Sequence, residues 1–492
     1  MKYHFVKSIG KILIFFLWII VAIAVAECVV RIYEYLVIQK NPLISSLNDK
    51  PPWSHSEVVS QKPLQSVEKF HSPDMSQWYA NRAKFFLQLD ETDRQLFSSF
   101  YQITTLVKDM DKKEIITYLP EPTTKNYFDE ELINILEKEI PIQSQEVYSK
   151  YYHSFAKGEE SISDLFVYYK MDTKNRGVMV CWYKAGNNNY PRNIKDRNGI
   201  WEIPYFEYKK HAQLNSYEFH TNNFGFRDED VVVPKPLGVF RIVCIGGSTT
   251  EEGPTEQETY PNIMEKLLLE QFQQQYKIEV INAGIPGISA HKLWLRLPDY
   301  LLMEPNLVLY CEGANDITHI LLPYWLNHLN GIKKILIHSN LCRNIFPLFF
   351  LPNDIQIQSD INKDILSQIE KINNYLQQKG ILFAVMSMPA PNYSSMTWQE
   401  KDYFQFVTKR WWGGNFVNYR MYSHVLDVYN RLLSKKFNNE NVLYIPMYEM
   451  FQNESPSYFN DLCHQKLQGI RKKSELATPY LVKYIKAQSG KS

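Results

Sequence analysis

Cysteine is scarce in this sequence, with six among 492 residues. The six form neither a Cys-x-x-Cys pair nor a Cys/His cluster with zinc-ligand spacing, which argues against a zinc module and predicts no disulfide framework. An excess of one charge is also lacking, because 54 Lys and Arg residues balance 53 Asp and Glu residues and leave a net charge of +1. That balance argues against binding of nucleic acid along a broad basic surface.

Long hydrophobic runs are few, and the main one lies near the N-terminus. Residues 12–30 are apolar apart from Glu27. In a helix, 19 residues span roughly 28 Å, close to the thickness of the hydrocarbon core of a bilayer. The run follows three lysines, Lys2, Lys7 and Lys11. By the positive-inside rule, such a segment keeps the N-terminus in the cytoplasm and exports the rest of the chain.

The end of this run distinguishes an anchor from a signal peptide. Ala24-Val25-Ala26 has the form of a cleavage site, which makes a cleaved signal peptide the alternative. The apolar pattern continues past this point, however, and Glu27 and Arg31 are spaced for an i,i+4 ion pair near the membrane interface. We therefore predict an uncleaved transmembrane anchor over residues 1–40, with the catalytic part on the exported, periplasmic or extracellular, side.

The next two stretches predict a linker and an accessory region. Prolines among polar residues over positions 41–76 are typical of a stalk. Residues 77–235 predict an accessory α+β region, whose strand aromatics either fill a small core or stack on sugars. Its predicted elements are a helix from Gln77 to about Met110, a helix over Phe128–Glu139, and strands at 165–169, 178–183 and 201–208.

A regular alternation of short apolar runs and helices follows, and it predicts a catalytic domain over residues 236–492. The predicted strands are 240–245, 278–282, 306–310, 381–386 and 441–445. Such alternation is typical of a parallel sheet with helices on both faces. Ligands of these sheets bind at the carboxyl ends of the strands, and each motif described next lies at such an end.

Ser248 comes directly after the first of these strands, in a Gly246-Gly247-Ser248 turn. A strand that turns sharply into a helix can present a hydroxyl at the edge of the sheet, and the helix N-terminus favours negative charge there. Ser248 is therefore a candidate nucleophile. Ser248 with Glu251 also matches a helix capping box. A phosphate-binding loop is a weaker alternative, because no Walker lysine follows and Gly253 does not complete a GxGxxG pattern.

Gly284 and Asn315 follow the second and third strands and are candidate oxyanion donors. The Gly284 N–H could point at a developing oxyanion, and the Asn315 amide could donate a further hydrogen bond. Asp316 is expected to brace this loop by accepting bonds from backbone N–H groups. The alternatives are an ordinary turn at Gly284 and an Asx turn at Asn315.

Asp461 and His464 follow the last strand. A carboxylate and an imidazole three residues apart on a turn can face each other, so Asp461 could orient His464 while His464 accepts the proton of Ser248. His291 and His319 are competing bases, but neither has an acid at such short spacing. A surface ion pair is the plain alternative for Asp461 and His464.

Taken together, the segments around Ser248, Gly284, Asn315 and His464 resemble the four blocks of the SGNH, or GDSL-like, hydrolase family. The resemblance covers about residues 240–485, and the lead-in Asn222-Asn223-Phe224-Gly225-Phe226-Arg227 is similar to membrane-anchored members. It implies a flavodoxin-like, doubly wound, five-stranded parallel sheet and ester hydrolysis through an acyl-serine. It also implies an oxyanion hole formed by the backbones of Ser248 and Gly284 and the Asn315 side chain.

One position departs from the family pattern. Gly247 stands where the signature Asp of the Gly-Asp-Ser motif is expected, which puts a lipase-like substrate in doubt. The segment from Ile335 to Pro352 is rich in Leu, Ile and Phe, and it predicts a helix that covers the sheet. A lid or a membrane-dipping element is the alternative for this segment.

These features predict an exported, membrane-anchored serine esterase that hydrolyses O-acyl, in particular acetyl, esters of a polysaccharide or another envelope glycan. An O-acyltransferase that passes the acyl group to a sugar hydroxyl would use the same triad. A non-catalytic glycan-binding or assembly protein with the same fold is the alternative from another class. The predicted mechanism needs no metal or cofactor. No nucleic acid partner is expected, and the sequence identifies no protein partner.

Overall fold

Five parallel strands form the main sheet of the protein. A computed structural model describes residues 18, 21–36, 40–45, 219–272, 277–412, 416–439 and 441–489, together with short segments between residues 85 and 214. The strands are β8 (Val239–Gly246), β9 (Lys277–Gly284), β10 (Leu307–Cys311), β11 (Leu382–Met386) and β12 (Leu443–Ile445). All four pairings are parallel. The predicted five-stranded parallel sheet is therefore confirmed.

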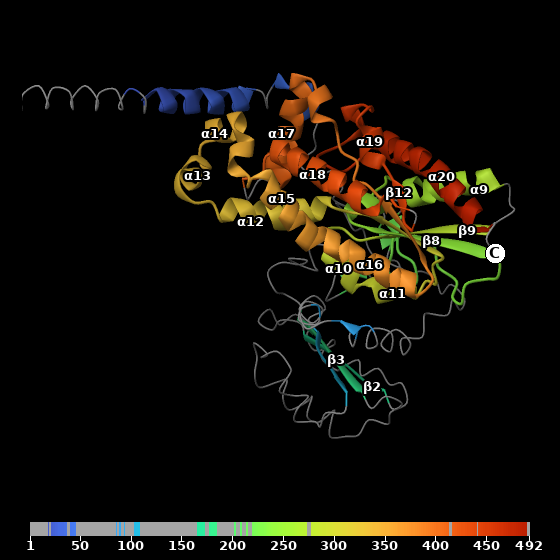
Figure 1. The fold of residues 1–492 in the computed structure, drawn as a ribbon. Coiled ribbons are helices and arrows are strands. Elements are labelled where there is room, and N and C mark those ends of the chain that lie inside the picture. Colours follow the sequence, from blue (N-terminus) through green and yellow to red (C-terminus); the bar gives the residue numbers. More distant parts are fainter. Residues whose placement is uncertain are drawn as a thin grey trace, which may run out of the picture.

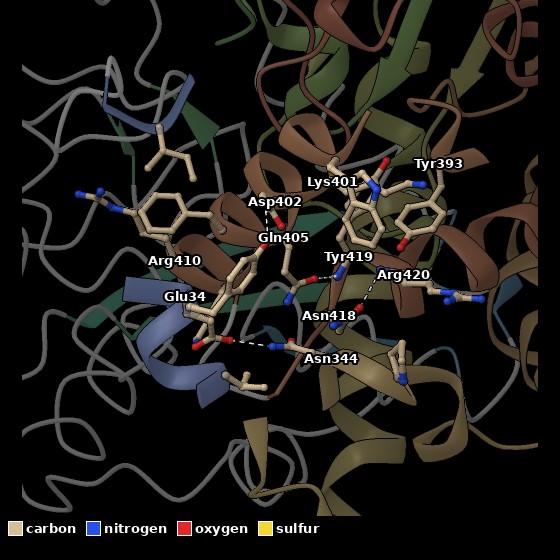
Figure 2. A pocket seen from close by; sticks show the side chains of 17 residues that line it. Glu34, Asn344, Tyr393, Lys401, Asp402, Gln405, Arg410, Asn418, Tyr419 and Arg420 are labelled. Atoms are coloured by element: carbon tan, nitrogen blue, oxygen red, sulfur yellow. Dashed lines mark hydrogen bonds and ion pairs between the residues drawn. The ribbon is translucent and has the colours of Figure 1, made fainter. Parts of the chain in front are cut away.

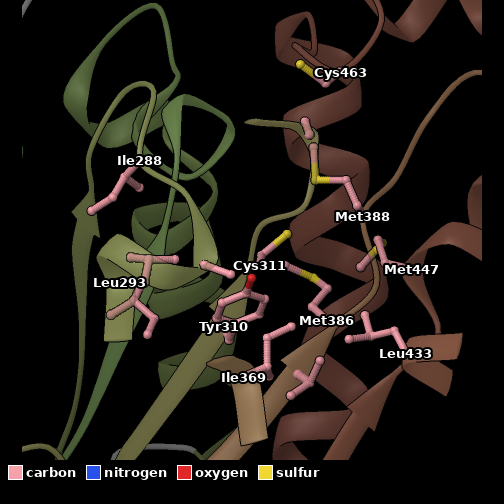
Figure 3. Packing of buried hydrophobic residues seen from close by; sticks show 14 of the residues in the cluster. Ile288, Leu293, Tyr310, Cys311, Ile369, Met386, Met388, Leu433, Met447 and Cys463 are labelled. Atoms are coloured by element: carbon pink, nitrogen blue, oxygen red, sulfur yellow. The ribbon is translucent and has the colours of Figure 1, made fainter. Parts of the chain in front are cut away.

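Helices cover both faces of this sheet (Figure 1). On one face α9 (Tyr260–Phe272) packs against α20 (Leu467–Ser489), and on the other α10 (Ala290–Leu295) packs against α16 (Ser367–Gln378). Because both faces are covered, the strands are predominantly apolar, with Arg241 in β8 and Glu279 in β9 as charged exceptions that pair with each other. Figure 3 shows part of the resulting core, where Tyr310 and Met386 lie beside Ile369 of α16.

Shorter helices connect these elements and surround the sheet. They are α2 (Pro42–Ser45), α8 (Ser248–Glu251), α11 (Leu297–Leu301), α12 (Leu322–Asn327), α13 (Gly331–Leu336), α14 (Asn340–Ile345), α15 (Asp354–Ile361) and α19 (Met447–Phe451). Two longer ones, α17 (Trp398–Trp412) and α18 (Tyr419–Phe437), lie near the N-terminal helix.

The strand order determines where a ligand can bind. The order is β12-β11-β10-β8-β9, so the first strand of the sheet, β8, lies between the second and the third. This is the flavodoxin-like order, in which the connections from β8 and β10 leave toward opposite faces and open a crevice at the carboxyl ends of the strands. Ser248 and Asn315 follow the two strands that border this crevice.

The accessory region contains a three-stranded antiparallel sheet of β1 (Ile103–Lys108), β2 (Leu165–Asp172) and β3 (Gly177–Lys184). β2 and β3 confirm two predicted strands. In the third, at 201–208, the structure describes two short strands that pair with each other, β4 (Trp201–Glu202) and β5 (Glu207–Tyr208). Two further two-residue strands, β6 (Gln213–Leu214) and β7 (Phe219–His220), pair with each other.

The predicted helix from Gln77 to Met110 is wrong at its C-terminal end, because β1 pairs with β3 there. β1 contains three β-branched residues in its first three positions and another at Val107, and such residues favour strands over helices. Phe85 and Leu89 of this region are buried in the main core. The predicted helix at 128–139 lies outside the described residues, and the predicted domain boundaries stay predictions.

The N-terminal helix runs along the catalytic domain instead of standing apart from it. Among the described residues, no helix is long and apolar enough to cross a bilayer, so the predicted transmembrane helix is not supported. Of residues 12–30, the structure describes residue 18 and residues 21–30. The predicted Glu27–Arg31 ion pair is present at 3.1 Å. Glu27 also accepts hydrogen bonds from the Ser339 hydroxyl (2.7 Å) and the Leu341 N–H (3.0 Å), which bind the helix to α14.

Two other predicted segments differ from expectation. The start of the predicted stalk packs on the domain, since Ile44 is buried and Asn41 donates to the Gln399 carbonyl at 3.0 Å. The segment 335–352 does not form a single helix: it contains the end of α13, α14 and a 3-10 helix, Pro347–Phe350. Ser339 caps α14 through a bond from the Cys342 N–H, which interrupts the expected helix.

Candidate active site

The turn after β8 presents Ser248 at the edge of the sheet. β8 ends at Gly246, and α8 begins at Ser248. Gly247 between them has no space for a side chain, because a Cβ there would overlap the carboxylate of Glu312 and lie 2.6 Å from Asn315 Nδ2. The close approach of these groups to the backbone requires glycine at this position.

Ser248, His464 and Asp461 form a continuous chain of hydrogen bonds. His464 Nε2 lies 2.7 Å from Ser248 Oγ, and His464 Nδ1 lies 2.8 Å from Asp461 Oδ2. The other carboxylate oxygen of Asp461 accepts the backbone N–H groups of Cys463 (2.8 Å) and His464 (2.7 Å), which closes the turn. The structure therefore brings the three predicted triad residues together in the order expected of a nucleophile, a base and an orienting acid, although Ser248 precedes His464 by 216 positions in the chain.

The environment of His464 favours proton acceptance. Burial lowers the pKa of His464, but the charge and hydrogen bond of Asp461 and the nearby Glu252 and Glu251 outweigh burial, so the pKa is raised above its ordinary value. The Asp461 bond to Nδ1 requires the proton on that nitrogen, which leaves Nε2 free to accept the Ser248 proton when the ring is neutral. Ser248 is 9% exposed and His464 3% exposed, so little water reaches this pair.

The three predicted oxyanion donors differ in whether they already have a hydrogen-bond acceptor. Asn315 Nδ2 donates one hydrogen to the Ile288 carbonyl at 3.0 Å and keeps a second hydrogen. The Ser248 N–H donates to no acceptor among the residues that the structure describes. The Gly284 N–H donates to the Asn282 side chain at 3.1 Å, so an oxyanion would share this donor with Asn282. An added Cβ at Gly284 would come within 2.9 Å of the Glu251 Cα, which explains glycine here.

Glu312 is a buried residue of this site that the sequence analysis missed. Its Oε1 accepts the backbone N–H groups of Gly313 and Asn315, each at 2.9 Å, and thereby fixes the loop that carries the Asn315 amide. Burial raises the pKa of the Glu312 carboxyl, against the effect of these bonds. Its other oxygen occupies the space that a side chain at position 247 would need. In place of the side chain of the signature Asp, a carboxylate reaches this space from Glu312, the residue that directly follows the neighbouring strand β10.

Glu252 is a second buried acid near the triad. Its Oε2 accepts the Gln465 N–H at 2.9 Å, which connects α8 to the loop of His464. Burial raises the pKa of Glu252 to about 8, although the nearby His464 and Lys473 lower it. Lys473 of α20 donates to the Thr249 carbonyl of α8 at 3.0 Å, and this bond connects the two helices.

The lead-in segment positions two of the catalytic loops. The buried Arg227 guanidinium donates to the carbonyls of Glu251 (2.9 Å) and Gly253 (3.0 Å), shortly after Ser248 in the chain. The Asp228 carboxylate accepts the Asn282 N–H at 2.6 Å, at the end of β9. The resemblance indicated this segment, but only these contacts reveal its structural role.

The structure also shows the contacts of Asp316 and of the two competing bases, His291 and His319. Asp316 accepts the Ala290 N–H at 3.0 Å and so braces the loop as expected. The competing bases make no hydrogen bond to Ser248. His291 lies 3.8 Å from Asp93, and burial lowers its pKa to about 4. Burial lowers the pKa of His319 as well.

Two groups of side chains among the described residues lie close enough to hold a metal ion. One consists of Asp461, Cys463 and His464, whose acid and imidazole already bond to each other and to Ser248. The other consists of His220, Glu229 and Glu256, in which His220 forms ion pairs with both carboxylates. In both groups, hydrogen bonds or ion pairs between the side chains explain why these side chains lie close together.

Comparisons with known proteins identify similar structures but no sequence relatives. Neither a family profile nor a curated protein matches this chain. Similar solved structures include TesA (15% identity, 49% of this chain and 97% of that chain, TM-score 0.31). Another is a protein described as lipolytic and of the G-D-S-L family from Desulfitobacterium hafniense (13%, 49% and 98%, TM-score 0.29). A third is a mutant of Axe2, an acetylxylan esterase from Geobacillus stearothermophilus (11%, 50% and 93%, TM-score 0.30).

Proposed function

We propose that this protein is a serine esterase that cleaves O-acyl esters through an acyl-Ser248 intermediate. The observation that carries the proposal is the hydrogen-bonded chain from Ser248 Oγ through His464 to Asp461 at the carboxyl edge of the sheet. A surface ion pair does not account for it, because His464 and Asp461 are buried and the second imidazole nitrogen contacts a serine hydroxyl.

The proposed reaction has two halves. Ser248 Oγ attacks the ester carbonyl carbon while His464 Nε2 takes the hydroxyl proton, and the carbonyl oxygen becomes an oxyanion that Asn315 Nδ2 and the Ser248 N–H stabilise. The carbon–oxygen bond to the alcohol then breaks, and the alcohol leaves with the proton from His464. In the second half, water attacks the acyl-serine and gives its proton to His464, and Ser248 leaves with that proton as the free acid is released.

The low exposure of Ser248 and His464 favours a short acyl group. A side chain that is 9% exposed has room for a small planar carbonyl but little for a long chain, so we propose acetyl or another short acyl group as the donor. A glycan as the alcohol part rests on the sequence-based expectation of an exported enzyme. Membrane attachment is part of the same proposal and is supported by exposed apolar side chains on the N-terminal helix, such as Val25 and Val29.

The test is hydrolysis of a small activated acetyl ester by the purified full-length protein, with mass spectrometry of the peptide that contains Ser248. We expect hydrolysis and a transient acetyl group on Ser248. The Ser248→Ala variant should lose roughly 10⁴-fold or more of the turnover while it keeps its unfolding temperature. Ser395→Ala, a change in a 3-10 helix without contact to the triad, is the matched control. Undiminished turnover of Ser248→Ala would contradict the proposal.

A further inference from the structure

A cavity of about 490 Å³ lies between the N-terminal helix and helices α17 and α18. Its volume falls within the range of roughly 300–1,000 Å³ that is typical of small-molecule sites. None of the triad residues is among the described residues that line it. Aromatic and apolar side chains form much of the wall, including Tyr33, Phe406 and Tyr419. The cavity is therefore a second candidate site with a different character from the first.

The acidic groups of the cavity already have partners. Glu34 accepts hydrogen bonds from Asn344 Nδ2 (2.8 Å) and from Lys409 Nζ (3.0 Å). Asp402 accepts a bond from the Tyr33 hydroxyl at 3.4 Å. These contacts join the N-terminal helix to α14 and α17, and Figure 2 shows Glu34 and Asn344 on one side of the cavity. The carboxylates therefore serve to hold the wall together.

Two cations of the cavity lack such partners. Lys401 Nζ lies 5.0 Å from the centre of the Tyr393 ring, and the Arg420 guanidinium carbon lies 5.7 Å from the same ring. Within the part of the chain that the structure describes, neither has a carboxylate at ion-pair distance. Figure 2 shows both cations gathered around Tyr393. Two positive charges beside an aromatic ring, without a counter-charge, suit an anionic group such as a phosphate.

The surface around this cavity is unusually apolar. Trp398 at its edge is 80% exposed, and Phe346, next to the lining residue Pro347, is 63% exposed. Ile335 of the neighbouring helix α13 is 69% exposed. Figure 1 shows the described part of the N-terminal helix beside α14. Large exposed apolar side chains next to unpaired cations are typical of a surface that contacts lipid.

We propose that this cavity binds an anionic membrane phospholipid, with its phosphate between Lys401 and Arg420 and an acyl chain along the apolar wall. Basic pockets beside apolar helices recognise anionic headgroups in this way. The site goes beyond the proposed esterase activity and does not depend on it. The bound lipid would hold the domain against a membrane. Helix α17 would separate the lipid from the loop that carries Asp461 and His464. Tyr403 on the inner side of α17 donates to the Asn460 carbonyl (2.6 Å), next to Asp461.

The test is native mass spectrometry of the full-length protein in a nonionic detergent, with phosphatidylglycerol or phosphatidylcholine of identical acyl chains. We expect one bound phosphatidylglycerol with at least ten-fold tighter binding than phosphatidylcholine. The double variant Lys401→Gln/Arg420→Gln should lose this preference. The matched control is Lys379→Gln, because Lys379 also lies over a tyrosine ring, Tyr375, at 5.3 Å but lines no part of the cavity.

Equal binding of the two lipids, or an unchanged preference in the double variant, would overturn the proposal. Inorganic phosphate should not displace the lipid, because it lacks an acyl chain; complete displacement by phosphate at equal concentration would show that the apolar wall is not used. If the double variant does not fold, the single variant Arg420→Gln replaces it, since this side chain is exposed. Ser248→Ala should bind the lipid like the wild type, which separates this site from the proposed catalytic one.

Discussion

The edge of the sheet and the cavity beside the N-terminal helix both contain charged side chains, but these charges have different surroundings. At the sheet edge, Asp461 and Glu312 accept backbone N–H groups and are fixed before any substrate arrives. In the cavity, Lys401 and Arg420 lie over the Tyr393 ring, where their positive charges can interact with an anionic ligand. Preorganised dipoles suit catalysis, because they cost no rearrangement during the reaction. Unpaired charges suit the binding of a charged ligand.

The largest effect that we expect at the sheet edge is on the pH dependence of stability, and it comes from Glu252. Its carboxyl has a pKa of about 8 in the folded protein, against an ordinary value of 4.5. Between these values the folded state retains a proton that the unfolded state has lost, so this group lowers stability as pH rises from about 4.5 to 8. At about 1.4 kcal/mol per pKa unit, the upper limit of this loss is roughly 5 kcal/mol.

Glu252→Gln cannot ionise, so it should be more stable than the wild type above pH 8 and show a flatter dependence of stability on pH. Urea unfolding at several pH values measures this difference. Glu370→Gln, a change of a half-exposed glutamate, is the control and should leave the slope as it is. A variant with the same slope as the wild type would mean that Glu252 ionises normally in the folded protein.

The second effect concerns the oxyanion donor of Asn315. Asn315→Ala removes the side-chain donor next to Ser248 and should lower kcat by about 10²–10³-fold, or roughly 3–4 kcal/mol. An acyl-serine should still be trappable, because the nucleophile and base remain. Esterase kinetics and intact-protein mass spectrometry measure the two parts. Lipid binding by this variant should stay at the wild-type level, whereas a parallel loss of both activities would indicate general unfolding.

The third effect concerns the space shared by Gly247 and Glu312. Gly247→Ala introduces a Cβ that overlaps the Glu312 carboxylate, so we expect kcat/KM to fall at least ten-fold. In a Glu312→Ala background the same change should have a smaller further effect, because one of the two overlapping groups is gone and only the contact with Asn315 Nδ2 remains. The double-mutant cycle should yield a coupling of about 1–3 kcal/mol. Additive effects of the two changes would mean that the two residues do not compete for space.

The smallest effect concerns the pH dependence of the proposed reaction. His464 must be neutral to accept the Ser248 proton, and its pKa is raised above the ordinary 6.5. The value of kcat/KM should therefore rise with pH through a midpoint above 6.5. A pH–rate profile of the full-length enzyme measures the midpoint. A midpoint below 6.5 would mean that the negative charges around His464 do not outweigh its burial.

Much of the fold and part of the site can be predicted from this sequence. The runs at 240–245 and 306–310 correspond to β8 and β10 within one residue, because strands that are covered on both faces are predominantly apolar. Ser248 and Asn315 could be selected as candidates because parallel strands end at one edge of the sheet. The spacing of three positions from Asp461 to His464 sufficed to predict their pairing, since a local turn determines it.

Tertiary structure decided the rest, because the deciding contacts join distant parts of the chain. The overlap of Glu312 with position 247 and the bond from Arg227 to the Glu251 carbonyl leave no local pattern in the sequence. The cavity also depends on where the N-terminal helix lies against α17. Apolar periodicity and chain order thus determined the elements of this protein, whereas the conformations of its loops and the packing of its helices decided which side chains meet.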